Sequence, residues 1–186
     1  MIIILYSGGA DSRYMLQKAL RYHKPEDITL LHLNYGQKMP EFEAVMRVAQ
    51  RFGLQTITAE ATLPPNPLRG DVPPGPGTSV SPAWVPGRNT VLLALAASWS
   101  EFFNAEEIWI GCDRSDQLAF PDCRKDFLDA MERVANAGRD PVLKKVKIVG
   151  PVMWLDKDDV LMTLQHEGVP VDEYVSGYPG TEVADA

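Results

Sequence analysis

The sequence predicts an α/β fold in which a parallel sheet is flanked by helices. Strand and helix patterns alternate along the chain, and a glycine-rich turn joins the first apolar run to the first amphipathic stretch. The length of 186 residues also fits one domain with a substantial core. Alternation of this kind implies right-handed crossovers between parallel strands, with ligands at the carboxyl ends of the strands.

The first element is the apolar run at residues 2–5, which predicts a buried strand. Further strands are expected at residues 28–34, 55–59, 107–111 and 146–149. The periodic stretches around them predict helices at residues 11–22, 40–52, 90–103, 126–137 and 156–165. Gly53 closes the second of these helices, and Asn89 is expected to cap the third.

The turn between the first strand and the first helix reads Tyr-Ser-Gly-Gly-Ala-Asp-Ser, residues 6–12. Ser7, Gly8 and Gly9 would place backbone N–H groups at a helix N-terminus, where the macrodipole favours an anion. The lysine of a Walker P-loop is missing. A Gly-Gly pair is by itself a common turn, but the added Ser7, Asp11 and Ser12 favour nucleotide binding.

One segment, residues 63–86, interrupts the alternation. It contains eight prolines and little periodicity, which predicts a long extended loop. This loop is either a disordered linker or a lid over the site. Because it runs directly into the polar stretch around Arg88, a lid is the favoured interpretation. A short C-terminal tail is expected from about residue 170.

Composition limits the classes of partner. A formal net charge of -7 argues against a broad nucleic-acid surface. The apolar run at residues 2–5 is too short for a signal peptide or a membrane span, so a cytoplasmic location without membrane contact is expected. The two cysteines, Cys112 and Cys123, offer neither a disulfide framework nor a metal knuckle, and two buried thiols are expected.

Five short motifs occur in a fixed order along the chain. They are the loop at residues 6–12, Tyr35-Gly36-Gln37, Val85-Pro86-Gly87-Arg88-Asn89, the stretch from Gly111 through Asp116 to Phe120-Pro121-Asp122-Cys123-Arg124 and Phe127, and Pro151-Val152-Met153-Trp154-Leu155-Asp156-Lys157. This set resembles the 7-cyano-7-deazaguanine synthase family, over residues 1 to about 178. The likeness implies a Rossmann-like HUP domain of the PP-loop ATP pyrophosphatase type, with residues 1–186 forming a single adenylating domain.

The resemblance implies an ATP-dependent ligase of queuosine-type deazapurine biosynthesis. It would convert 7-carboxy-7-deazaguanine and ammonia to 7-cyano-7-deazaguanine, through an acyl-adenylate and an amide. The backbone of Ser7, Gly8 and Gly9 would hold the departing pyrophosphate, assisted by the hydroxyl groups of Ser7 and Ser12. Asp11 would act through Mg²⁺ carried with ATP.

Positive charge near the phosphates has one strong and one weaker candidate. Arg88, at a helix start, is expected to neutralise phosphate or substrate carboxylate charge, the alternative being a surface salt bridge. Lys157 is a weaker candidate for the same role, because a lysine one turn into a helix is usually solvated.

The resemblance places a second group of residues around the deazaguanine: Gln37, Asp116, Phe120, Asp122 and Arg124. An aspartate can accept from the guanine-like N–H edge, and an aromatic ring can stack on the base. Asp122 fits equally well as the cap of the helix that begins near Arg124. Cys123 is better explained by packing than as a nucleophile.

Departures from the family pattern limit what the resemblance implies. Gly177 stands where the first of four zinc-binding cysteines is expected, so no zinc is expected. The expected glutamate after the second motif is out of register, with Glu41 and Glu43 flanking its place. These changes question the amide-to-nitrile step more than the adenylation. Two alternatives therefore stay open: an enzyme that stops at the amide or acylates another amine, and a non-catalytic nucleotide-binding module. The sequence also leaves a homodimer open.

Overall fold

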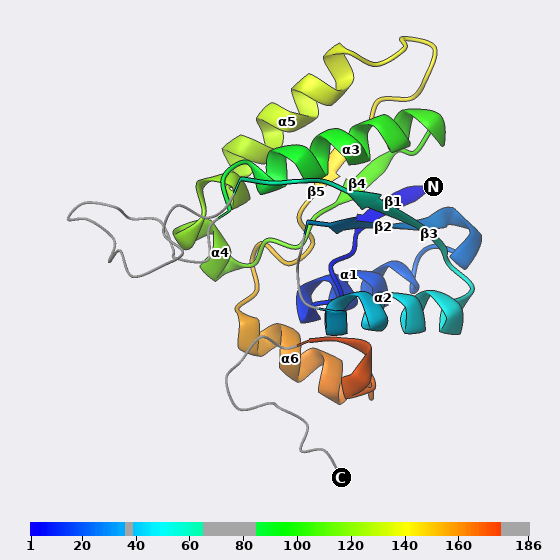
Figure 1. Cartoon of the computed structure of the whole chain (residues 1–186), viewed down its shortest axis with the longest axis vertical. Helices are drawn as coiled ribbons and strands as arrows, with labels where there is room; N and C mark the ends of the chain where they lie inside the picture. Colours follow the sequence, from blue (N-terminus) through cyan, green and yellow to red (C-terminus); the bar gives the residue numbers. More distant parts are fainter. Residues whose placement is uncertain (36–38, 65–84, 176–186) are drawn as a thin grey trace, which may run out of the picture.

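A five-stranded parallel sheet forms the centre of the computed structural model, which describes residues 1–35, 39–64 and 85–175. Its spatial order is β3-β2-β1-β4-β5 (Figure 1). The strands are β1 (Ile2–Leu5), β2 (Ile28–Asn34), β3 (Gln55–Glu60), β4 (Glu107–Trp109) and β5 (Lys147–Val149). The predicted parallel sheet is thereby confirmed.

The central strand β1 explains the position of the site. All four of its residues are buried, as expected for a parallel strand covered on both faces. Ile4 pairs with Leu30 of β2 on one side and with Trp109 of β4 on the other. The chain order reverses between β1 and β4, which leaves a crevice at their carboxyl ends.

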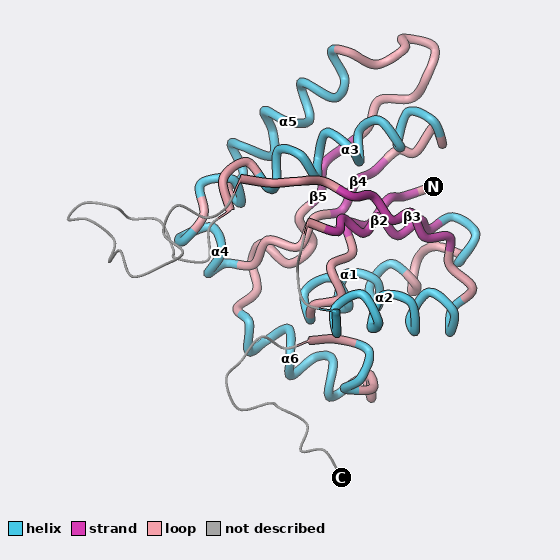
Figure 2. Tube along the Cα trace, viewed as in Figure 1, coloured by secondary structure: helices cyan, strands magenta, loops and turns pink. Residues whose placement is uncertain are grey.

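Helices cover both faces of the sheet (Figures 1 and 2). On one face lie α1 (Ala10–Ala19), α2 (Met39–Phe52) and α6 (Lys157–His166). On the other lie α3 (Arg88–Phe102) and α5 (Lys125–Ala137). Alternate residues of β1 divide between these layers: Ile2 and Ile4 belong to the core with α1, and Ile3 and Leu5 to the core with α3.

The expected strands and helices are confirmed to within a few residues, but one helix was not expected. The short helix α4 (Arg114–Ala119) follows β4 and begins with a capping box. In this box Asp113 caps the backbone of Asp116, and the Asp116 carboxylate accepts from the N–H of Asp113. The Asp-x-x-Asp spacing was a signal for this helix that periodicity alone does not carry.

The prediction that Asn89 caps α3 was wrong. The helix begins one residue after Gly87, whose φ of 70° lies in the left-handed region. Asn89 is buried inside the first turn, and its amide donates to the carbonyl of Asp122 and to the thiol of Cys123. The side chain of Asn89, which local sequence patterns assign to a helix cap, therefore makes a tertiary contact with the 3-10 helix η2 (Pro121–Cys123) instead.

Two expected segments fall partly or wholly outside the described residues. Residues 65–84 of the proline-rich loop are not described, so its function as a lid stays a prediction. The chain after α6 is described as far as Val175 and contains the 3-10 helix η3 (Val171–Glu173). Within the described ranges, no helix has the length and apolar character needed to span a membrane.

Candidate functional site

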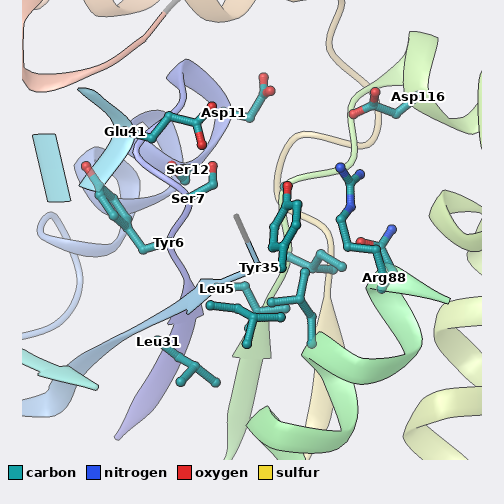
Figure 3. Close-up of a pocket in the computed structure, with 15 residues that line it drawn as sticks. Leu5, Tyr6, Ser7, Asp11, Ser12, Leu31, Tyr35, Glu41, Arg88 and Asp116 are labelled. Atoms are coloured by element: carbon teal, nitrogen blue, oxygen red, sulfur yellow. Dashed lines mark hydrogen bonds between the residues drawn. The ribbon is translucent and has the colours of Figure 1, made fainter. Parts of the chain in front are cut away.

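A cavity of about 280 Å³ lies at the carboxyl ends of β1, β2 and β4 (Figure 3). It occupies the crevice where the strand order reverses, the usual ligand site of such sheets. Its lining comes from the strands, from the loops after them, and from the first turns of the helices that follow, α3 included. The lining residues are Leu5, Tyr6, Ser7, Asp11, Ser12, Leu31, Leu33, Tyr35, Glu41, Arg88, Asn89, Leu92, Ile110, Gly111 and Asp116.

The phosphate loop, residues 7–12, forms one wall of this cavity. The Ser7 hydroxyl accepts from the N–H of Gly9 at 3.2 Å, and the Ser12 hydroxyl donates to the carbonyl of Gly9 at 2.8 Å. The two hydroxyl oxygens are 3.4 Å apart. Since α1 starts at Ala10, the positive end of its dipole faces the cavity, as the sequence predicted.

Gly8 allows the loop to pass closely beneath the start of α2. Its φ is +90°, and a Cβ at this position would lie 2.3 Å from the backbone carbonyl oxygen of Glu41. Real Cβ atoms do not approach a backbone oxygen this closely, so any side chain would displace either the loop or α2. The glycine is therefore required by both conformation and space.

We expect Gly8→Ala to abolish ATP binding and to lower the free energy of unfolding by about 1–3 kcal/mol, because the loop must move or accept strain. Gly53→Ala is the matched control: Gly53 also has a positive φ, of +64°, but nothing lies within 4 Å of a Cβ there. Urea unfolding and calorimetric titration with ATP would measure both effects. An ATP affinity of Gly8→Ala equal to that of the parent would contradict the assignment of residues 7–12 as the ATP-binding loop.

Three carboxylates meet where the start of α1 approaches the start of α4, and two of them, those of Asp11 and Asp116, line the cavity. One oxygen each from Asp11, Asp113 and Asp116 lies within 4.8 Å of the others. Asp11 follows β1, whereas Asp113 and Asp116 follow β4 and are held by the capping box of α4. Lys157, at the start of α6, forms an ion pair with Oδ2 of Asp11. Oδ1 of Asp11 is buried and has no hydrogen-bond partner among the described residues.

The electrostatics of this cluster favour a cation. Burial raises the pKa of Asp11, and the ammonium group of Lys157 opposes that shift. Burial, followed by the nearby charge of Asp113, raises the pKa of Asp116 to about 6. Three carboxylates with one lysine leave excess negative charge in a partly buried site. Such a set of oxygen donors suits a divalent cation such as Mg²⁺.

The raised pKa of Asp116 predicts a pH dependence of stability in the metal-free protein. Its carboxyl group titrates near 3.9 in an unfolded chain and at about 6 in the folded one. The folded state therefore binds more protons between these values, and its stability decreases as pH rises through them. We expect the melting temperature of the parent protein, relative to that of Asp116→Asn, to fall from about pH 4 to about pH 6 and then level off. A constant difference in melting temperature between the two proteins across this pH range would contradict the raised pKa of Asp116.

Arg88 enters the cavity from the first turn of α3 (Figure 3). The left-handed turn at Gly87 directs the chain into the helix at this point. Burial acts to lower the pKa of Arg88, but a hydrogen bond to Tyr35 and the combined electrostatic effect of Tyr35, Cys123 and Asp122 raise it. The guanidinium therefore stays charged in the cavity that the phosphate loop also lines. The structure brings together Arg88, Asp116 and the phosphate loop, which the sequence assigned to one site.

Three expected substrate residues are not among the lining residues of this cavity in the described part of the chain. Phe120 packs against the core shared by α3 and α5. The Asp122 carboxylate accepts from the N–H of Asn89 at 3.4 Å and so caps α3 rather than α5. Arg124 is exposed and donates to the carbonyl of Gln117. Their roles toward substrate stay predictions.

The remaining residues named from the sequence also differ in whether they line the cavity. Gln37 lies outside the described residues. Cys112 and Cys123 are both buried and unbridged, which fits the packing interpretation of Cys123. Of the two flanking glutamates, Glu41 lines the cavity, whereas Glu43 is exposed and lies 4.0 Å from Arg47.

Sequence reasoning missed two contributors to the site. Asp113 belongs to the acidic cluster, and only its Asp-x-x-Asp spacing signalled a special position. Tyr35 was noted as part of a motif but not as the partner of Arg88. Neither contact is visible in the sequence, because Asp113 meets Asp11 between the segments that follow β4 and β1, and Tyr35, after β2, meets Arg88 at the start of α3.

Comparisons with known proteins agree on one family. The whole chain, residues 1–186, matches the family described as "Queuosine biosynthesis protein QueC". Curated relatives with the name 7-cyano-7-deazaguanine synthase include one from Chlorobaculum parvum, 31% identical over 86% of this chain and 74% of the relative. Others come from Koribacter versatilis (31% identical, 98% of this chain, 81% of the relative) and Nitratiruptor sp. (32%, 98% and 86%).

A solved structure is similar in fold. It is the U34-tRNA thiolase NcsA from Methanococcus maripaludis with its [4Fe-4S] cluster, with a TM-score of 0.59 and 14% sequence identity. The match covers 96% of this chain and 60% of that one. At this identity the likeness supports the α/β fold alone.

Proposed function

This chain belongs to the QueC family of queuosine biosynthesis proteins, and we propose that it acts as a 7-cyano-7-deazaguanine synthase. It would be an ATP-dependent ligase that forms a carbon–nitrogen bond between 7-carboxy-7-deazaguanine and ammonia, within one adenylating domain. The observation that carries this proposal is the single cavity shared by the phosphate loop, Arg88 and the carboxylates of Asp11 and Asp116.

The chemistry explains why such a cavity is needed. A carboxylate is a poor electrophile, because its carbonyl is electron-rich and its leaving group would be oxide. Attack of the substrate carboxylate on the α-phosphorus of ATP forms an acyl-adenylate and releases pyrophosphate. Ammonia then attacks the acyl carbon, and AMP leaves to give the amide. Adenylation of the amide oxygen by a second ATP releases another pyrophosphate; the oxygen then leaves with AMP, and loss of the two N–H protons gives the nitrile, a net loss of one water from the amide.

The described side chains suit the first of these steps. The hydroxyl groups of Ser7 and Ser12 and the start of α1 would hold the departing pyrophosphate. Arg88 would neutralise charge on the phosphate or on the substrate carboxylate. Lys157, paired with Asp11, would add a second positive charge next to the acidic cluster.

Mg²⁺ fits the acidic cluster of this chain. The buried Oδ1 of Asp11 has no partner within the described residues, and carboxylate oxygens of Asp113 and Asp116 lie within 4.8 Å of the Asp11 carboxylate. These three residues would hold the ion, which supplies charge neutralisation to the phosphate oxygens of ATP. Asp116 has a competing proposed role as acceptor for the deazaguanine N–H groups.

We propose that the enzyme works without zinc. Its two cysteines are both buried: Cys112 follows β4 and Cys123 is part of η2, so neither belongs to the segment after α6. A structural zinc site needs four thiolate or imidazole ligands. Elemental analysis should therefore find no stoichiometric zinc, and one zinc per chain would overturn this part of the proposal.

Product analysis tests the proposed function. Purified protein, ATP, Mg²⁺, an ammonium salt and 7-carboxy-7-deazaguanine are incubated, and the product is identified by mass spectrometry. The nitrile differs from the amide by one water. The nitrile is the expected product; accumulation of the amide would favour the variant that stops one step earlier. ATP binding without any turnover would favour a non-catalytic nucleotide-binding module.

A further inference from the structure

The last described residues of the chain pair with the phosphate loop. The N–H of Val175 donates to the carbonyl of Gly8 at 2.9 Å, and the carbonyl of Val175 accepts from the N–H of Ala10 at 3.3 Å. These bonds form an isolated parallel bridge between Gly9 and Val175. The phosphate loop therefore has a backbone partner that comes from the segment after α6.

A buried carboxylate anchors this segment two residues earlier. Glu173 is 4% exposed, and its Oε2 accepts from Nε of Arg13 and lies 2.9 Å from Nη2 of the same side chain. Its Oε1 accepts from Arg51 at the end of α2. Arg13 is itself 1% exposed, lies over the ring of Phe52 at 5.4 Å, and follows Ser12 directly in the first turn of α1.

The anchor thus acts on the phosphate loop from both of its ends. Through Arg13 it fixes the first turn of α1, which presents Asp11 and Ser12 to the cavity. Through the short segment to Val175 it fixes the backbone of Gly8 and Ala10. A buried ion pair contributes little net stability, but removal of one partner leaves the other charge uncompensated, so the pair strongly restricts geometry.

We propose that Glu173 is a positioning residue for the phosphate loop, and that it sets the affinity for the pyrophosphate portion of ATP without touching the nucleotide. The proposal rests on the proposed function only in that the loop must bind pyrophosphate. It assigns a role to the segment after α6, although no described residue of that segment lines the cavity.

The first test compares Glu173→Gln with Asp172→Asn. Both remove one negative charge, but Asp172 is exposed and only 3.9 Å from Arg47 at the surface. In Glu173→Gln we expect the Kd for Mg²⁺-pyrophosphate and the KM for ATP to rise by about tenfold, with kcat changed much less, the pattern of lost ground-state binding. In Asp172→Asn both should match the parent. Affinity for 7-carboxy-7-deazaguanine should be unchanged in both variants.

The second test examines the backbone bridge itself. Val175→Pro removes the N–H that bonds to Gly8, whereas Val175→Ala keeps it. Tyr174 has φ -155° and ψ 152°, which is compatible with a following proline. Pyrophosphate should bind more weakly to Val175→Pro than to Val175→Ala. If Glu173→Gln does not fold, this pair alone decides.

Calorimetric titration with pyrophosphate on the full chain keeps the outcomes distinct. Parent-like pyrophosphate affinity in any folded Glu173→Gln or Val175→Pro protein overturns the positioning role. A parent protein that binds neither pyrophosphate nor ATP removes the proposed function as well. Weakened pyrophosphate binding in the variants supports the inference whichever product the parent enzyme makes.

Discussion

Replacement of Asp11 by asparagine is expected to slow the carboxylate-dependent cleavage of ATP to AMP and pyrophosphate by at least about 10²-fold. The substitution keeps the shape of the side chain but removes the charge at the centre of the acidic cluster. It also leaves Lys157 without its partner at the cavity wall. The rate of AMP formation, measured with and without 7-carboxy-7-deazaguanine, reports the effect.

Asp158→Asn is the matched control for this prediction. Asp158 is an exposed carboxylate next to Lys157 on α6, and it does not line the cavity. Its replacement by asparagine therefore changes the net charge by the same amount as Asp11→Asn but leaves the cavity unaltered. We expect it to leave turnover near that of the parent. Release of ADP and phosphate in place of AMP and pyrophosphate, by any of these proteins, would contradict the adenylation chemistry.

The second large effect is expected for Arg88→Ala. Loss of a preorganised guanidinium from the cavity that the phosphate loop lines should slow adenylation by about 10²–10³-fold. Binding of 7-carboxy-7-deazaguanine to this variant shows which anion Arg88 neutralises: it should weaken if the guanidinium pairs with the substrate carboxylate, and stay parent-like if the guanidinium acts on the phosphate. Single-turnover measurement of AMP formation separates the chemical step from substrate binding. Arg21→Ala is the control, since Arg21 is an exposed arginine paired with Glu167 on the surface.

A titration of Asp116→Asn decides between the two proposed roles of that carboxylate. If Asp116 accepts from the deazaguanine, the variant should bind 7-carboxy-7-deazaguanine more weakly, by about 1–3 kcal/mol, and ATP normally. If it acts mainly on the metal, Mg²⁺-ATP affinity should fall while the deazaguanine binds as tightly as to the parent. Its position beside Asp11 and Asp113 favours the second outcome.

Local pattern was sufficient for the strands, the main helices and the phosphate loop. The buried strand β1 is a continuous apolar run, and helices such as α2 and α5 show a 3.6-residue period, so each could be predicted without knowing its neighbours. The loop at residues 7–12 was equally local, because its glycines and hydroxyls lie within six consecutive positions. These features depend on interactions between residues that are close in the chain.

Tertiary structure alone decided which polar side chains share a site. Pairing of β1 with β4 brings Asp11 close to Asp113 and Asp116, although they belong to loops far apart in the chain. Asn89 does not cap α3, because its buried side-chain amide donates hydrogen bonds to two residues of η2, Asp122 and Cys123. The contact between Arg13 and Glu173 spans 160 positions. A buried charge or amide takes whichever partner the packed fold brings near, since an unpartnered one is costly, and periodicity carries no information about that partner.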